Sequence, residues 1–98
     1  MRFAREVQFQ LKTGKEQEFN TLFEKDVLPM LRKQNGFQSS LTLVDARGSQ
    51  AISLWDDRKS ADAYQTAEYA GVLAKLTTVI EGTPTVKTYE TASSYARA

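Results

Sequence analysis

The chain contains neither cysteine nor histidine. Without cysteine there can be no disulfide, no thiolate nucleophile and no zinc–sulfur site. Without histidine there is no imidazole ligand for haem, zinc or non-haem iron, no Ser-His-Asp triad, and no use of the commonest general base. The acidic residues follow no metal-ligand spacing. We therefore expect no metal site and no cofactor.

Two further features are missing, a long apolar run and an excess of charge. With 13 basic and 12 acidic residues, the chain has no basic stripe of the kind that binds nucleic acid. No apolar run is long enough to cross a membrane, and no apolar signal region is present, so we expect a cytoplasmic protein. The length of 98 residues and the hydrophobic fraction of 41% suit one domain over residues 1–98.

The first predicted strand spans residues 2–11. Alternation places one charged and four apolar side chains on the same face: Phe3, Arg5, Val7, Phe9 and Leu11. Burying a lone charge is costly. We therefore expect Arg5 to form a salt bridge or to lie at an exposed strand end, with an anionic ligand as the alternative.

A kinked helix is predicted next. Thr13 and Glu16 fit a capping box at its start. One apolar stripe with helical spacing follows, formed by Phe19, Leu22, Phe23, Val27, Met30 and Leu31. Pro29 removes a hydrogen bond and crowds the preceding turn, which predicts a distortion over residues 25–28. Asn35-Gly36 predicts the end of the helix.

The second half of the chain predicts two strands, a helical region and a last strand. In chain order these are a strand at 37–44, a turn at 45–49, a strand at 51–55, a helix at 58–69 capped by Asp57, an interruption at Gly71, more helix through Ile80, a stop at 82–84 and a strand at 85–91. The order β-α-β-β-α-β predicts a ferredoxin-like α+β sandwich, with helices on one face of an antiparallel sheet.

The opposite sheet face needs its own explanation. Simple alternation places a mixed set of side chains there: Gln8, Gln10, Ser40, Thr42 and Val44. Such a face is either solvated or packed against a second copy of the chain.

Two segments resemble the antibiotic biosynthesis monooxygenase-like group of the dimeric α+β barrel superfamily. One is VLPMLRKQNGF at 27–37, where a helix leads through Gly-Phe into a strand. The other is LWDDRKSADAY at 54–64, where a strand ends at tryptophan and a capped helix begins. The resemblance implies a small homodimer whose two sheets form a barrel, with a pocket between sheet and helices in each subunit.

The family includes haem-degrading enzymes and cofactor-independent oxygenases of polyaromatic substrates. The haem-degrading branch uses an asparagine on the first strand, with a tryptophan and a histidine on the second helix. The corresponding positions here are Val7, Tyr64 and Ala74, which argues against haem degradation. The oxygenases instead need a group that helps to form or hold a substrate anion, for which the resemblance offers Arg5, Trp55, Tyr64 and Tyr69.

The candidate ligand-binding residues are therefore Arg5, Val7, Phe23, Trp55, Tyr64 and Tyr69, and the catalytic residues are unknown. Trp55 is more typical of core packing than of ligand stacking. Tyr64 fits a ligand donor and a half-buried helix residue equally well. Tyr69 fits a surface aromatic better than the alternative, a residue at the mouth of a pocket.

Two functions remain open at this stage. One is binding of a small aromatic or hydrophobic metabolite, with cofactor-independent oxygenation as the accompanying chemistry. The other is a non-catalytic ligand-binding or stress-response module. An RNA-recognition domain shares the ferredoxin-like fold, but polar residues follow Gly36-Phe37 where that class needs aromatic and basic ones.

Overall fold

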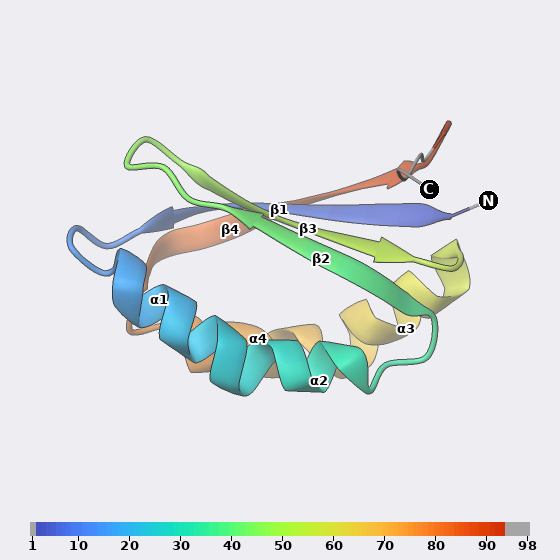
Figure 1. Ribbon diagram of the computed structural model, residues 1–98, viewed down its shortest axis with the longest axis horizontal. Helices are drawn as coiled ribbons and strands as arrows, with labels where there is room; N and C mark the ends of the chain where they lie inside the picture. Colours follow the sequence, from blue (N-terminus) through green and yellow to red (C-terminus); the bar gives the residue numbers. More distant parts are fainter. Residues whose placement is uncertain (1, 94–98) are drawn as a thin grey trace, which may run out of the picture.

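The computed structural model describes residues 2–93. It confirms the predicted ferredoxin-like α+β fold, with four antiparallel strands in the order β2-β3-β1-β4 and all helices on one face of the sheet (Figure 1). In chain order the elements are β1 (Phe3–Leu11), α1 (Glu16–Leu22), η1 (Phe23–Val27), α2 (Leu28–Arg32), β2 (Phe37–Leu43), β3 (Ser49–Trp55), α3 (Arg58–Ala67), α4 (Tyr69–Leu76) and β4 (Ile80–Glu90). The tail at 94–98 lies outside the described residues. No helix within residues 2–93 has the length and apolar character needed to span a membrane.

The first helical region confirms the predicted distortion. Between α1 and α2 lies η1, a π-helical turn over Phe23–Val27. Pro29 has no N–H for the carbonyl of Lys25, and its ring crowds that carbonyl, so the turn before it widens. The widening keeps Phe19, Val27 and Leu31 buried on one stripe.

The predicted capping box at the start of α1 is wrong. Lys15 holds the N-cap position, and no side chain caps the helix. The N–H of Lys15 donates to the carbonyl of Lys12 at 3.1 Å, and Gly14 has a φ of +77°. Thr13 therefore lies inside a tight turn, two residues before the N-cap position, and cannot cap the helix.

The alternation of β1 is confirmed, but that of β2 is wrong. A bulge between Phe37 and Ser39 shifts the register by one residue. Because alternate residues face opposite sides, the shift exchanges the two faces. Ser40 and Thr42 now lie on the helix side, and two leucines point outward: Leu41, 57% exposed, and Leu43, 47% exposed.

The region after residue 67 also differs from the prediction. The helix breaks at Glu68 and continues through Gly71, and it ends at Leu76 instead of Ile80. Strand β4 begins at Ile80. The segment 82–84, predicted to be a helix stop, forms an irregularity within this edge strand, where a proline without an N–H is tolerated.

Candidate functional site

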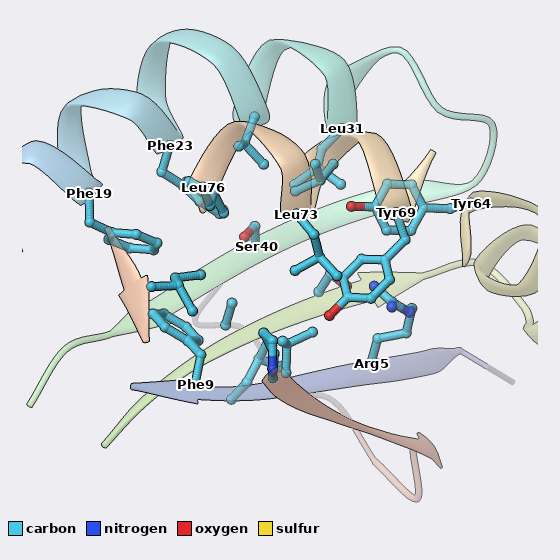
Figure 2. Close-up of a pocket in the computed structure, with 18 residues that line it drawn as sticks. Arg5, Phe9, Phe19, Phe23, Leu31, Ser40, Tyr64, Tyr69, Leu73 and Leu76 are labelled. Atoms are coloured by element: carbon cyan, nitrogen blue, oxygen red, sulfur yellow. The ribbon is translucent and has the colours of Figure 1, made fainter. Parts of the chain in front are cut away.

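A cavity lies between the helices and the inner face of the sheet (Figure 2). Its wall is mostly apolar, and its volume is about 50 Å³. Among the residues that line it are Val7, Phe9, Phe19, Phe23, Val27, Leu31, Leu73 and Leu76. Ligand pockets usually measure about 300–1,000 Å³, so the cavity must widen to take more than a small group.

One end of the cavity is polar because Arg5 lies there. Its residue exposure is only 3%. The guanidinium carbon lies 5.0 Å from the ring centre of Tyr64 and 4.7 Å from that of Tyr69, within cation–π range. Nη2 donates a hydrogen bond to Oε1 of Gln65. Figure 2 shows the arginine and both tyrosines together at this end of the cavity.

The expectation of a salt bridge or an exposed strand end for Arg5 is wrong. Within residues 2–93 no carboxylate forms an ion pair with it. Burial lowers the pKa of Arg5, although the neighbouring tyrosines oppose this shift. Arginine stays protonated in proteins. The cavity therefore holds a buried positive charge that aromatic rings and one amide oxygen surround.

Tyr64 and Tyr69 come from consecutive helices on either side of the break at Glu68. The expectation that Tyr69 lies at the surface is wrong, because only 9% of it is exposed. The break makes Tyr69 the first residue of α4 and lets its ring turn toward the sheet. Within the described structure its buried hydroxyl has no hydrogen-bond partner.

Both tyrosine hydroxyls stay protonated and are suited to donate hydrogen bonds. Burial raises the pKa of Tyr64 to about 12, and Arg5 reduces this effect. Burial likewise raises the pKa of Tyr69. At neutral pH both hydroxyls therefore stay protonated and can donate hydrogen bonds to a ligand oxygen.

Trp55 belongs to the core, which confirms the packing interpretation. It is fully buried, and its indole N–H donates to Oγ of Ser53 at 2.9 Å. Its ring centre lies 5.5 Å from that of Phe37 and 5.1 Å from that of Tyr64. Trp55 is not among the residues that line the cavity.

The structure therefore brings five of the six candidates to one cavity: Arg5, Val7, Phe23, Tyr64 and Tyr69. Ligand binding by these residues stays a prediction.

Sequence reasoning missed Gln65, Ser40 and Ser53. The register pairs Ser53 directly with Arg5, a relation that one strand alone does not reveal. Within residues 2–93 no three acidic side chains cluster as metal ligands.

The unpartnered hydroxyl of Tyr69 gives a first prediction. Tyr69→Phe should raise the free energy of unfolding of the empty protein by roughly 1 kcal/mol, since it removes a buried polar group that lacks a hydrogen bond. Urea denaturation measures the change. Tyr89→Phe is the matched control, because Tyr89 is 49% exposed and its hydroxyl loss should have little effect. A clear loss of stability in Tyr69→Phe would show that its hydroxyl has a partner.

Comparison with known proteins adds information on the fold. No protein-family model and no curated protein matches the sequence. Solved structures do match. A putative antibiotic biosynthesis monooxygenase from Nitrosomonas europaea has 17% identity and a TM-score of 0.74, covering 93% of this chain and 90% of its own.

Two oxygenases from Streptomyces match over nearly the whole chain. SnoaB from Streptomyces nogalater, a cofactor-independent oxygenase solved as mutant N63A, has 14% identity and a TM-score of 0.77, covering 98% of each chain. The monooxygenase from the gene ActVA-Orf6 of Streptomyces coelicolor, solved in complex with nanaomycin D, has 14% identity and a TM-score of 0.78. That match covers 98% of this chain and 92% of the other. This chain therefore has the fold of the antibiotic biosynthesis monooxygenases, as the two sequence segments predicted.

Proposed function

We propose that this chain acts in the cytoplasm as a homodimer that binds a small aromatic or hydrophobic metabolite in the cavity of each subunit. The observation that carries the proposal is an apolar cavity closed at one end by Arg5, Tyr64 and Tyr69. An apolar wall with a few convergent polar groups is typical of small-molecule sites. The ligand-bound Streptomyces coelicolor monooxygenase gives support from the same fold.

The chemistry that fits this cavity is cofactor-independent oxygenation. An anthrone-type substrate carries its own electrons: its CH₂ carbon and O₂ yield a ketone and one water. Arg5, Tyr64 and Tyr69 would hold the developing oxyanion by donated hydrogen bonds, while the apolar wall excludes water. The comparison with SnoaB, a cofactor-independent oxygenase, supports this reaction class.

The second candidate is a non-catalytic binding module. One observation favours it: the wall contains no histidine and no carboxylate, so no side chain there is suited to take a proton from a substrate at neutral pH. Such a module would bind the same class of ligand and leave it unchanged.

Ligand binding followed by oxygen uptake separates the two candidates. We would screen anthrone- and quinol-type compounds by calorimetry, then measure O₂ consumption with those that bind. An oxygenase should consume O₂ saturably, and Tyr64→Phe should lower affinity or rate by about 1–3 kcal/mol. Binding without O₂ uptake would favour the module. No binding by any compound would count against both.

Dimerisation gives a second prediction. The outer sheet face exposes Leu41, Leu43 and Tyr89, and the family resemblance implies a second sheet packed against it. A standard interface buries about 1,600 Å² in total. Light scattering at micromolar concentration should give twice the chain mass, and Leu41→Glu should give a folded monomer. Ala70→Glu, on the exposed side of α4, is the control. A wild-type monomer would overturn the proposed dimer.

A further inference from the structure

We propose that the cavity selects ligands that are already ionised, namely a small aromatic molecule whose anionic oxygen lies against Arg5 and the hydroxyl of Tyr69. This inference rests on the proposed function, because it assumes that the cavity binds a ligand. It adds the charge state of that ligand, which the similarity in fold does not indicate.

The first argument is the unbalanced charge of Arg5. A buried charge is normally paired, because removing it from water is costly even after the protein relaxes. Arg5 is 3% exposed, and within residues 2–93 it has no ion-pair partner. The two rings and Gln65 compensate it only in part. A ligand anion would complete the pairing.

The second argument is an excess of donors over acceptors. A guanidinium has five N–H groups. One donates to Gln65, and the hydroxyl of Tyr64 lies close enough to interact with another. The hydroxyl of Tyr69, whose ring lies against the same guanidinium, has no partner in the described structure. Unused donors on two neighbouring side chains match the several lone pairs of a carboxylate or phenolate. A neutral hydrocarbon would leave these donors unpaired.

The third argument is that the wall offers no base. The lining residues include no aspartate, glutamate or histidine. The polar ones besides Arg5 and the tyrosines are Ser40 and Ser53, and Ser53 already accepts a hydrogen bond from the indole of Trp55. A ligand that arrives protonated would find no side chain suited to remove its proton. The site therefore favours a ligand whose anion has already formed in solution.

The cavity volume agrees with an anionic head entering first. About 50 Å³ has room for a few waters or a small head group, but it is far smaller than the roughly 300–1,000 Å³ of typical ligand pockets. The ring needs the wall to move. The helices are interrupted at η1, which supplies Phe23 and Val27 to the wall, and at Glu68, next to Tyr69. At these interruptions the helices can move apart with the smallest loss of regular hydrogen bonds.

The experiment uses 4-nitrophenol, whose colour reports its own ionisation, with 4-nitroanisole as the permanently neutral match. Wild-type protein should bind the phenolate about 10- to 100-fold more tightly than the neutral compound, as expected for charge-assisted hydrogen bonds. Adding protein should accordingly lower the pH at which 4-nitrophenol ionises in the mixture. Benzoate against benzamide gives the same comparison for a carboxylate and shows which anion the site prefers.

Three variants identify the source of the preference. Arg5→Met keeps a long apolar side chain and should abolish the preference for the anion, while Arg5→Lys keeps the charge and should retain part of it. Arg47→Met is the control, because Arg47 lies in the exposed β2–β3 turn. Thermal melts establish that each variant is folded. Arg5, Tyr64, Tyr69 and the nearby Glu68 are the charged or titratable groups around the site, so all affinities are compared at one pH.

The outcomes are distinct. Equal binding of phenolate and anisole, or an unchanged preference in Arg5→Met, would overturn this inference and leave the proposed ligand site standing. Absence of binding by all four compounds would overturn both. Loss of the preference in Arg5→Met, with retention in Arg47→Met, would establish it.

Discussion

Replacing Trp55 by alanine should lower the free energy of unfolding by roughly 3–5 kcal/mol, since a fully buried tryptophan is removed and a cavity is left. The indole holds together the end of the core where β3 passes into α3. Its ring contacts Phe37 from β2 and Tyr64 from α3, and its N–H satisfies Ser53. The substitution therefore loses contacts to two other elements, β2 and α3, and also leaves the hydroxyl of Ser53 without its donor.

Urea denaturation at constant protein concentration measures this loss. Tyr64→Phe is the matched variant, because it keeps the ring stacked 5.1 Å from Trp55 and removes only a hydroxyl. Its stability should stay within about 1 kcal/mol of the wild type. A Trp55→Ala protein that loses less than ~1 kcal/mol would mean that its surroundings collapse into the space or that the ring is not central to packing.

The features that sequence predicted well are those set by neighbours along the chain. Alternation in β1 predicted the buried face correctly, because the pairing of β1 with β3 is regular from Phe3 to Phe9. Pro29 acts on the turn before it, so the π-helical distortion follows from one residue. Asp57 caps α3 as predicted, accepting the N–H of Ser60 at 2.9 Å.

The features that sequence missed depend on partners far along the chain. The bulge that reverses the faces of β2 exists only in its pairing with β3. The early start of β4 depends on β1, whose Leu11 pairs with Ile80, and Lys12 donates to the carbonyl of Val79 at 2.8 Å. The residues around Ile80 continue the apolar spacing of a helix, so the local sequence does not indicate that a strand begins there. Tertiary pairing therefore overrode the local preference.

The candidate site shows the same division. The sequence identified Arg5 as anomalous, because a charge on an apolar strand face requires an explanation. Its surroundings could not be read from the sequence, since they come from residues about sixty positions later: Tyr64, Gln65 and Tyr69. A salt bridge is the usual solution, and here two aromatic rings and an amide stand in its place.

The two segments that carry the family resemblance lie against each other in the structure. The N–H of Asp56 donates to the carbonyl of Gly36 at 2.7 Å, and the next residue, Phe37, packs edge-on against Trp55. Gly36 has a φ of +81°, a conformation that favours glycine. These residues join the α2–β2 loop to the start of α3, so this part of the resemblance rests on residues that specify the fold. Tyr64, at the end of the second segment, also lines the cavity.

Gly36→Ala should therefore destabilise the protein by about 3 kcal/mol. The positive φ alone costs roughly 1–2 kcal/mol for a residue with a Cβ. That Cβ would also collide with Oγ and Cβ of Ser60, so the loop or α3 must shift.

Gly14→Ala is the matched control for Gly36→Ala, because its φ is +77° and its added Cβ meets nothing within 4 Å. It should show the conformational cost alone, roughly 1–2 kcal/mol. Urea denaturation compares the two, and Ser60→Gly in the Gly36→Ala background should recover part of the excess loss, as coupled neighbours do. Equal losses of unfolding free energy in Gly36→Ala and Gly14→Ala, with no recovery on adding Ser60→Gly, would mean that close packing of Gly36 against Ser60 does not stabilise the contact between the α2–β2 loop and α3.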